Sequence, residues 1–325
     1  MKKIIAWTVA AAAVLAVGGI IAWSFSVSGN ERAAKVKVRG NGATTQLTSS
    51  PDATVRSEQV GYFDHLEVTG PFDVTYTKDG SSVVTLRGHK ADLDCVAIQC
   101  RDSHLTITLP GNRNGKSKTE RIAVELSSQA LRELDVTAGA SFTAEDVVST
   151  DEISIDGKSS AKVNIGRIIC RNFEADAQSS ANIELRTINA DECDLSAESS
   201  GHLFASAVKA AKIEADAESS ASVEVDMMEG DTFNSDVESS GAVAVKNFTG
   251  KLVKAEVESS GALRVQGTVY RVNLQAESAG EIDASQLSAE YATVRCASGG
   301  KIKYNAVSGD YNNSKSARNY YTPKK

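Results

Sequence analysis

A tripeptide of two serines followed by alanine or glycine recurs every ~20 residues in this chain, and it constrains the fold more than any other feature. The six regular copies are Ser159-Ser160-Ala161, Ser179-Ser180-Ala181, Ser199-Ser200-Gly201, Ser219-Ser220-Ala221, Ser239-Ser240-Gly241 and Ser259-Ser260-Gly261. Looser copies extend the array on both sides: Gly139-Ala140-Ser141, Ser278-Ala279-Gly280 and Ser298-Gly299-Gly300. A fixed period of this length predicts a repeat architecture, here of about nine coils.

The residues on both sides of each tripeptide alternate between apolar and polar, which is the period of β-strands. Aligning the copies produces apolar columns. One column, before the tripeptide, is Ile153, Phe173, Cys193, Ile213, Phe233, Val253 and Val272; another, after it, is Val163, Ile183, Leu203, Val223, Val243, Leu263 and Ile282. A helical period and a leucine-rich frame are both absent from these units. The sequence therefore predicts an all-β parallel β-helix, or β-solenoid, with ~20-residue coils whose inward side chains stack from coil to coil.

The tripeptide itself has a structural explanation. Small residues suit a tight corner where the chain leaves one face of a coil, and glycine tolerates a positive φ there. A catalytic serine would need an activating base beside it, and a column of equivalent serines offers no unique one. We therefore interpret the serines as corner residues.

The N-terminus predicts export from the cytoplasm. Lys2 and Lys3 precede an uncharged apolar run from Ile4 to Phe25. The run is about as long as the ~20 residues of a membrane-spanning helix and exceeds the ~7–15 residues of a signal-peptide core, although small residues near its end leave cleavage open. Because the two lysines would stay in the cytoplasm, the rest of the chain is expected outside it. Residues 1–28 are thus a signal anchor or a signal peptide, and the solenoid is membrane-anchored in the cell envelope or, after cleavage, secreted.

The remaining chain divides by composition. Residues 29–59 are expected to be a polar tether, in which Lys35-Val36-Lys37-Val38 could form a first strand. Residues 60–134 alternate without the serine corners and are expected to cap the solenoid, since an open end would leave strand edges unpaired. Residues 135–310 form the regular array, which we expect to fold as one rod, and 311–325 form a basic tail.

Three segments of the N-terminal part, read together with the array, resemble a known family. They are Gly40-Asn41-Gly42, Phe63-Asp64-His65-Leu66-Glu67-Val68-Thr69-Gly70-Pro71-Phe72-Asp73-Val74 and Asp102-Ser103-His104-Leu105-Thr106-Ile107. The chain resembles the putative auto-transporter adhesin head domain, also called the head GIN domain, over roughly residues 36–305. The resemblance implies an exported envelope protein with a β-helical fold and a binding or adhesive role, and it supplies no catalytic residues.

Most motifs that could indicate a binding or catalytic site lack a residue or a spacing that the site requires. Gly115-Lys116-Ser117 lacks the glycine that a phosphate-binding loop needs five positions earlier, where Pro110 stands. The histidines are scattered in the sequence without metal-ligand spacing. The five cysteines are odd in number and imply no structural disulfide. The histidines are His65, His89, His104 and His202, and the cysteines are Cys95, Cys100, Cys170, Cys193 and Cys296. The sequence accordingly predicts no catalytic residue, no cofactor and no metal site of this kind.

Acidic residues stack at the outward positions just before the corner. One column is Asp156, Asp176, Asp216, Asp236 and Glu256, and the next is Glu198, Glu218, Glu238, Glu258 and Glu277. Two interpretations stay open. The stripe is a solvated face that keeps the molecule soluble and discourages sideways association, or it binds Ca²⁺ or a cationic partner, since hard cations take carboxylate oxygens. The speculative binding stripe is centred on Asp216, Glu218, Asp236, Glu238, Glu256 and Glu258.

The charge balance limits the function. With 42 acidic against 35 basic residues the net charge is -7, which argues against binding nucleic acid or an anionic membrane surface. The favoured interpretation is a non-enzymatic envelope protein whose solenoid binds or adheres to an envelope or extracellular ligand, either protein or glycan. The alternatives are a polysaccharide-active β-helix enzyme, which would need a localised carboxylate site among aromatics, and a membrane-tethered scaffold or sensor.

Overall fold

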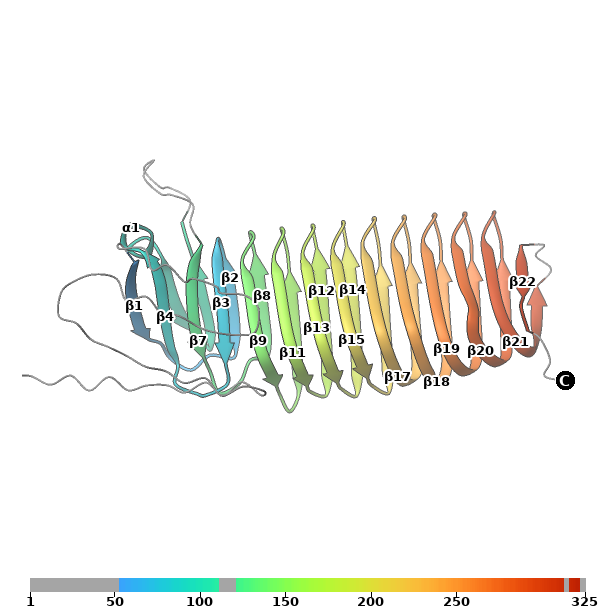
Figure 1. Cartoon of the computed structure of the whole chain (residues 1–325), viewed down its shortest axis with the longest axis horizontal. Coiled ribbons are helices and arrows are strands. Elements are labelled where there is room, and N and C mark those ends of the chain that lie inside the picture. Colours follow the sequence, from blue (N-terminus) through green and yellow to red (C-terminus); the bar gives the residue numbers. More distant parts are fainter. Residues whose placement is uncertain (1–52, 111–120, 313–315, 322–325) are drawn as a thin grey trace, which may run out of the picture. The chain divides into compact units, whose positions relative to one another are not determined.

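The computed structural model describes residues 53–110, 121–312 and 316–321 (Figure 1). The expected anchor over 1–28, the expected strand over 35–38 and the Gly115-Lys116-Ser117 segment lie outside the described residues. Within the described ranges, no helix has the length and apolar character needed to cross a bilayer.

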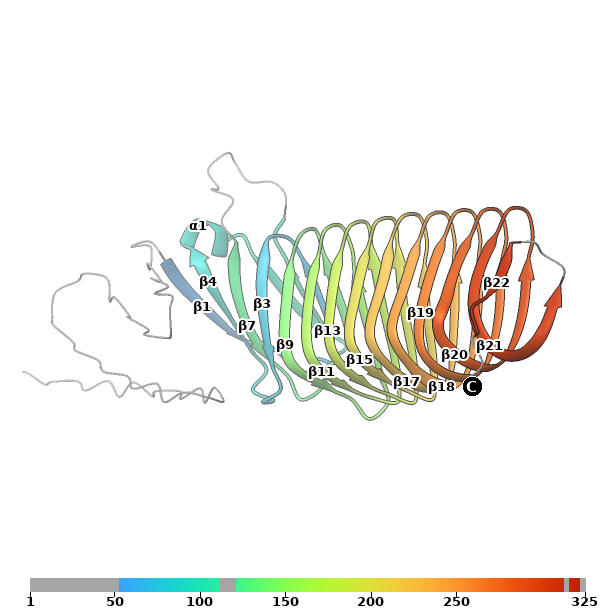
Figure 2. The same cartoon turned by 45° about the vertical axis from the view of Figure 1, so that its right-hand side comes forward.

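Each coil of the array contributes two strands that flank the serine corner. One stack of parallel strands comprises β8 (Glu133–Thr137), β10 (Glu152–Gly157), β12 (Asn172–Gln178), β14 (Glu192–Glu198) and β16 (Lys212–Ala217). The other comprises β9 (Ser141–Val148), β11 (Lys162–Ile169), β13 (Asn182–Asn189) and β15 (His202–Lys209). The serine corners form one edge of the solenoid, and the turns that lead from each coil into the next form its second edge. In the later coils one continuous strand curves round this second edge and belongs to both stacks (Figure 2): β17 (Ser222–Val237), β18 (Ala242–Val257), β19 (Ala262–Ala276) and β20 (Glu281–Cys296).

The two stacks give the solenoid two broad outward surfaces, the acidic face and the opposite face. The acidic face is the outward surface of β8, β10, β12, β14, β16 and the C-terminal halves of β17 to β20. The opposite face is the outward surface of β9, β11, β13, β15 and the N-terminal halves of β17 to β20. The core lies between them.

The pairing register explains the core. Ile153 pairs with Phe173, Phe173 with Cys193 and Cys193 with Ile213, so each partner is the equivalent residue of the next repeat. Every member of both predicted apolar columns is buried. Because each inward side chain lies on its equivalent in the next coil, the interior is a stack of apolar layers. The prediction of an all-β solenoid of about nine coils is confirmed.

One polar residue interrupts the core without a cost in lost hydrogen bonds. Ser235 takes an inward position and is only 5% exposed. Its hydroxyl donates a hydrogen bond of 2.7 Å to the carbonyl oxygen of Ala215 in the preceding coil. A buried hydroxyl with a partner is tolerated, whereas one without a partner is costly.

Serines close the regular corners, where the expectation that glycine takes the positive φ is wrong, whereas in the looser copies Gly139 and Gly299 do adopt φ angles of 74° and 88°. In the copy Ser199-Ser200-Gly201 the serines have φ angles of 50° and 68°, and the amide of Gly201 donates to the carbonyl oxygen of Glu198 at 2.8 Å. The two serines, not glycine, therefore take the left-handed conformation. Glycine stands in the third position because a Cβ on Gly201 would lie 1.8 Å from the carbonyl oxygen of Ala177 in the coil before.

The first, looser corner begins one residue earlier than the sequence suggested. Ala138 and Gly139 have φ angles of 54° and 74°, and Ala140 takes the buried third position. The corner is thus Ala138-Gly139-Ala140 and not Gly139-Ala140-Ser141. This coil is slightly longer than the regular ones, since Ser141 pairs with Lys162 whereas Lys162 pairs with Asn182.

The N-terminal cap continues both stacks, but its order in space differs from its order in the sequence. The strand β2 (His65–Thr69) lies between β8 and β6 (His104–Thr108), and β3 (Phe72–Thr77) lies between β9 and β7 (Ile122–Ser127). Three antiparallel strands and a short helix complete this end: β1 (Ala53–Gln59), β4 (Val83–His89), β5 (Ala97–Arg101) and α1 (Lys90–Leu93). The strand β1 falls within the range 29–59 that was expected to be a tether.

A shorter strand covers the other end. The last coil contains β21 (Lys301–Asn312), and β22 (Ala317–Asn319) pairs with its first residues. The side chain of Asn319 accepts a hydrogen bond from the amide of Ala306 at 3.2 Å and donates one to its carbonyl oxygen at 3.1 Å. These bonds satisfy part of the strand edge that would otherwise be unpaired.

Candidate functional site

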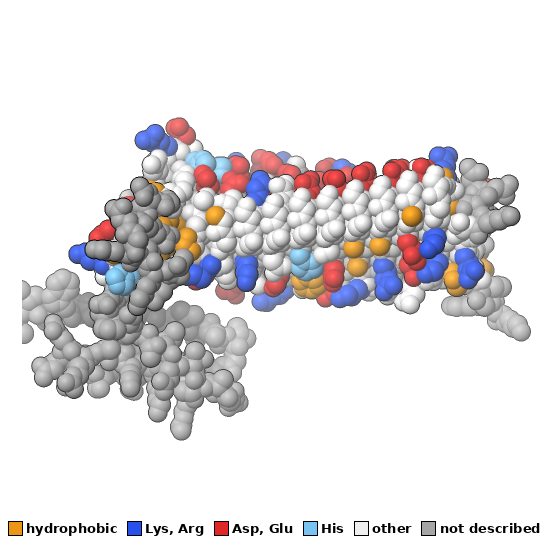
Figure 3. All heavy atoms as spheres, turned by 90° about the horizontal axis from the view of Figure 1, so that it is seen from above, with side chains coloured by type: hydrophobic (Ala, Val, Ile, Leu, Met, Phe, Trp, Pro, Cys, Tyr) orange, Lys and Arg blue, Asp and Glu red, His pale blue; other side chains and the backbone are white. Residues whose placement is uncertain are grey.

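The predicted acidic stripe is assembled on the acidic face. Asp156 pairs with Asp176, and Asp236 pairs with Glu256, so the first column is continuous apart from Ser196. It also extends into the cap, because Asp135 pairs with Asp156 and with Glu67 in turn. Figure 3 shows the resulting row of acidic side chains beside the white ridge of corner residues.

The second predicted column lies directly beside the first. A hollow of about 260 Å³ is lined by Glu198, Glu218 and Glu238 from this column and by Asp216 and Asp236 from the other. Five carboxylates from three successive coils therefore border one small concavity. Of the six speculative binding residues, Asp216, Glu218, Asp236 and Glu238 line this hollow, and Glu256 continues the column beside Asp236.

Partial burial raises the pKa of two aspartates of the acidic face, Asp216 and Asp194. Burial raises the pKa of Asp216 to about 7, and the nearby charges of Glu214 and Asp194 add to the shift, although the backbone amide of Asp236 donates to Asp216 and opposes it. Burial also raises the pKa of Asp194 to about 6, with Glu214 and Glu174 contributing. Removing water from a carboxylate and placing like charges nearby both disfavour ionisation. The face therefore holds charges that are poorly hydrated and mutually repulsive.

Two of the carboxylates are also incompletely bonded. Oδ2 of Asp156 accepts from Lys158 Nζ at 2.6 Å, and Oδ2 of Asp176 accepts from Gln178 Nε2 at 2.6 Å. The Oδ1 atoms of Asp156 and Asp176 are buried and have no hydrogen-bond partner among the described residues. A buried acceptor without a donor is costly, so a bound donor or cation at these atoms would be favourable.

Two further hollows lie along the same face. One of about 190 Å³ is lined by Glu174, Asp194 and Glu214, with Lys212 at its side. The other, of about 680 Å³, crosses the C-terminal coils, where Lys254 and Arg295 join Asp236 and Glu256. The face is thus acidic over the middle coils and becomes mixed in charge toward β20.

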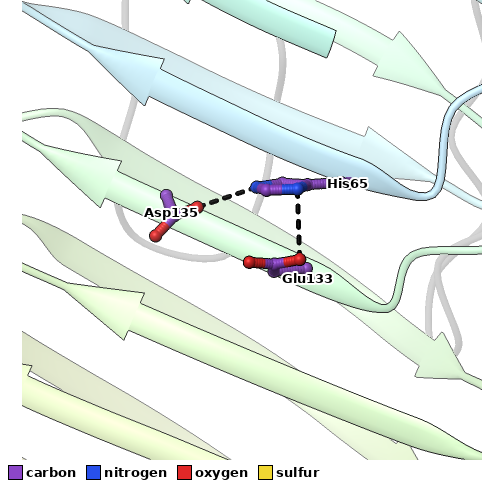
Figure 4. Close-up of side chains that lie close together, drawn as sticks. All are labelled: His65, Glu133 and Asp135. Carbon is purple, nitrogen blue, oxygen red and sulfur yellow. Dashed lines mark hydrogen bonds and ion pairs between the residues drawn. The ribbon is translucent and has the colours of Figure 1, made fainter. Parts of the chain in front are cut away.

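A second cluster lies where the cap meets the array, and the sequence argument missed it. The imidazole of His65 on β2 lies between two carboxylates of β8 (Figure 4), with Nε2 2.8 Å from Asp135 Oδ2 and Nδ1 3.1 Å from Glu133 Oε2. The ring of His104 on β6 stacks on His65 with 3.7 Å between ring centroids, and its Nε2 lies 3.4 Å from Glu67 Oε2. The histidines that seemed scattered include one contacting pair.

A short repeated motif accounts for this cluster. The three paired strands read His65-Leu66-Glu67-Val68-Thr69, His104-Leu105-Thr106-Ile107-Thr108 and Glu133-Leu134-Asp135-Val136-Thr137. The second and fourth residues of each copy are buried, and the first and third face outward. Aligning the three copies is the sequence signal that would have placed His65 between His104 and Glu133.

The other chemically reactive residues do not join either cluster. His202 lies on the opposite face, where its Nδ1 is 2.7 Å from the hydroxyl of Ser222, and His89 is exposed at the end of β4. Cys95, Cys100, Cys170 and Cys193 are free thiols. Cys193 is buried in the apolar column, and burial raises the pKa of its thiol.

The fold and its surface define the class of protein: a parallel β-solenoid that presents one long, hollowed and predominantly acidic face. The family is identified by the sequence. Residues 62–247 and 226–310 match the family described as "Putative auto-transporter adhesin, head GIN domain", and the chain belongs to this family. The resemblance expected from the N-terminal segments and the array is therefore confirmed.

Several solved structures are similar. A putative adhesin from Bacteroides fragilis is 15% identical, with a TM-score of 0.46 and coverage of 80% of this chain and 98% of that chain. A putative adhesin from Parabacteroides merdae is 13% identical, with a TM-score of 0.49 and coverage of 88% and 97%. A putative lipid binding protein from Parabacteroides distasonis is 15% identical, with a TM-score of 0.40 and coverage of 83% and 95%. No curated protein matches the chain. Similarity at this level carries no conclusion about a ligand.

Proposed function

We propose that this chain is a non-enzymatic cell-envelope protein that binds a cationic ligand on the acidic face of its solenoid. The family description, with its reference to an auto-transporter adhesin, supports an envelope location and a binding role. One observation carries the assignment of the face: Asp216 and Asp236, both with raised pKa values, lie in successive coils and border a hollow together with three further carboxylates.

Elsewhere in the array, charged residues of neighbouring coils form ion pairs instead of a row of like charges. On the second edge, charges of opposite sign alternate between coils, as in Arg171 with Asp151 at 3.1 Å. The pairs Lys209 with Glu229 at 2.9 Å and Lys251 with Asp231 at 2.7 Å repeat the arrangement. Alternating signs hydrate the surface without repulsion, whereas like charges one strand spacing apart repel by about 1 kcal/mol per pair even in water. The acidic face thus reduces stability in a way that the other edge avoids, and binding of a cation would offset the repulsion.

The enzyme alternative has no support from the family, whose description names adhesion and no reaction. The carboxylates recur from coil to coil, and a general acid and base need a single differentiated pair. A ligand-binding surface accounts for the repetition better than a catalytic centre does.

A linear polyamine, spermine, tests the proposal on the full chain by calorimetry at low and at physiological salt. We expect binding that weakens as salt rises, because it is electrostatic. The variant Asp216→Asn/Asp236→Asn should bind at least about fivefold more weakly, since it removes two charges from one hollow. The matched variant Glu184→Gln/Glu224→Gln, on the opposite face, should change affinity by less than about twofold. Absence of binding, or equal weakening in both variants, would contradict the proposal.

Calcium gives a second arm of the same test. We expect CaCl₂ to raise the melting temperature no more than NaCl of matched ionic strength, because a Ca²⁺ site needs ~6–8 convergent oxygens and parallel columns do not converge. An excess shift that disappears in Glu218→Gln/Glu238→Gln/Glu258→Gln would instead identify the ligand as Ca²⁺ held between coils. An equal shift in the two salts favours an extended polycation as the ligand, and an excess shift with CaCl₂ favours a single bound ion.

A further inference from the structure

We propose that His65, Glu133 and Asp135 bind a divalent transition-metal ion, such as Zn²⁺, at the junction between the cap and the array. One imidazole nitrogen and one oxygen from each carboxylate lie within 4.8 Å of one another. Ligands of Zn²⁺ lie ~2.0–2.2 Å from the ion, so two ligands of one ion are at most about 4.4 Å apart. The two carboxylates contact different nitrogens of the ring, so an ion on one nitrogen requires the carboxylate at the other nitrogen to leave its contact and turn toward the ion. Figure 4 shows that the three side chains lie close together.

The donor set fits such an ion. Imidazole suits zinc, copper, iron and nickel, whereas Ca²⁺ and Mg²⁺ prefer oxygen alone. Three protein ligands also leave a fourth position of a tetrahedral ion open to water or to a group from a partner. This distinguishes the cluster from the all-carboxylate columns of the acidic face.

The charges of the cluster give an independent reason to expect a bound cation. Among the described residues, Glu133 and Asp135 form ion pairs only with His65, and Glu67 pairs only with His104. Lysine and arginine take no part in these pairs. With neutral imidazoles, three carboxylates would lie together with only Lys158, which acts on Asp135 without forming an ion pair with it, to offset their charge, and a divalent ion would supply the remainder.

The second histidine supports the site from one side. His104 stacks against His65 at 3.7 Å and lies nearly parallel to it, with 12° between the ring planes. Its Nε2 is buried and has no hydrogen-bond partner among the described residues. Parallel rings cannot both bind one ion in this arrangement, because a metal lies in the plane of each imidazole that holds it. His104 therefore orients the His65 ring by stacking and is not a ligand in this arrangement.

The competing occupant of the cluster is a proton. The contacts of 2.8 Å and 3.1 Å also suit an imidazolium that donates to both carboxylates. A metal ion on His65 would displace that proton, so its affinity should fall as the pH decreases. Low pH therefore favours the proton and high pH favours the metal ion, so metal affinity should rise with pH.

The position of the site gives it a structural consequence. His65 belongs to the cap strand β2, and Glu133 and Asp135 belong to β8, the adjoining strand of the array. An ion bound only when these strands are paired would stabilise the folded chain by mass action. The proposal is independent of spermine binding, because the residues tested above lie on other coils.

The experiment titrates ZnCl₂ into the full chain after removal of metals with a chelator and dialysis. We expect one Zn²⁺ per chain by calorimetry, a higher melting temperature with ZnCl₂ than with MgCl₂, and weaker binding at low pH. His65→Gln and the isosteric Asp135→Asn should each weaken binding at least about tenfold. His202→Gln, which removes a histidine from the opposite face, should leave it unchanged.

Two additional measurements show whether a loss of Zn²⁺ binding comes from the substituted ligand or from unfolding. Circular dichroism of each variant establishes that it folds, and Co²⁺ in place of Zn²⁺ reports its ligands by its visible absorption. Absence of Zn²⁺ binding by the folded chain would overturn the proposal and leave the proton as the occupant. Unchanged binding in both folded variants would place the ion elsewhere and overturn it equally.

Discussion

At the scale of single residues, the corner serines are the positions where local preference and observed conformation disagree most. Ser219 and Ser220 have φ angles of 56° and 67°, and the same pair of left-handed residues recurs in the other regular copies. A residue with a Cβ loses roughly 1–2 kcal/mol in this conformation, and glycine does not. Each regular corner therefore has a small backbone strain and carries two serine hydroxyls.

We expect Ser220→Gly to raise the free energy of unfolding by about 0.5–1 kcal/mol, because glycine adopts the positive φ without strain. Denaturant unfolding of the full chain measures the change. As a control, Ser154→Gly introduces glycine on the extended strand β10, where it should lower the free energy of unfolding by a similar amount. Stabilisation by both changes would show that the corner conformation is not the cause.

A second change tests the assignment of inward and outward positions. Phe233 is fully buried, with its ring centroid 5.8 Å from that of Phe248. We expect Phe233→Ala to lower the free energy of unfolding by ~3–5 kcal/mol, because it removes apolar contact and leaves a cavity. Glu238 is exposed at the end of the same strand, and Glu238→Ala should have almost no effect. Equal effects in denaturant unfolding would mean that the columns are misassigned.

At the scale of the strand, the acidic face predicts a dependence of stability on pH. The pKa of Asp216 is raised from 3.8 to about 7, so the folded chain holds this proton more tightly than the unfolded chain does. Stability should therefore fall as the pH rises from about 4 to about 7 and level off above that, because the folded state must lose a proton that the unfolded state has already released.

The variant Asp216→Asn should reduce this dependence, and the part due to Asp194, whose pKa is raised to about 6, should remain. The variant's amide oxygen can still accept from the backbone of Asp236, while the charge is lost. We expect a higher melting temperature than wild type at about pH 8 and little difference at about pH 4, measured by thermal unfolding. Asp226→Asn on the opposite face breaks a 2.7 Å contact with Lys246, so it should give no such gain. A gain for Asp216→Asn at both pH values would assign the effect to packing.

The array and the cap differ in how far their sequences predict them. In the array, each strand pairs with its equivalent in the next repeat, so columns such as Ile153 and Phe173 identify neighbours directly. In the cap, β2 enters between β6 and β8 although its sequence neighbours lie elsewhere. Alternation predicts that these segments are strands, but it does not specify their order or that β1, β4 and β5 run antiparallel.

The same difference explains which site residues were found. Asp216 and Asp236 share a repeat position, so their column followed from the period alone. His65 and His104 are brought together by the cap, where His65 pairs with His104 on one side of β2 and with Glu133 on the other, at two unequal and long sequence intervals. Motif spacing of a few residues does not detect such a pair, because the contact depends on which strands become neighbours.

At the scale of the whole molecule, stability is a sum over neighbouring coils. Each coil contacts the coil before it and the coil after it, through register-matched pairs such as His202 with Ser222. In an architecture of this kind the number of coils is adjustable, while the length of one coil is fixed by the stacking. The cap and β22 cover the two ends and keep strand edges from pairing with other molecules.

Deleting one complete coil tests this description. Removal of residues 202–221 joins Gly201 to Ser222, which occupies the position that His202 held. We expect the shortened full chain to stay soluble and rich in β-structure by circular dichroism, with a moderately lower free energy of unfolding, because every remaining strand keeps an equivalent neighbour.

Removing half a coil, residues 202–211, joins the corner at Gly201 directly to Lys212 and eliminates β15 alone. The strand β16 would then follow the corner in place of β15 and lie against β13, a strand of the other stack. The next serine corner, Ser219-Ser220, would fall on the wrong edge of the coil, and the strand edges left unpaired should cause aggregation. Chromatography and circular dichroism of the two deletion variants separate the outcomes. Equal behaviour of the two, whether both fold or both aggregate, would show that the complete coil is not the unit of stability.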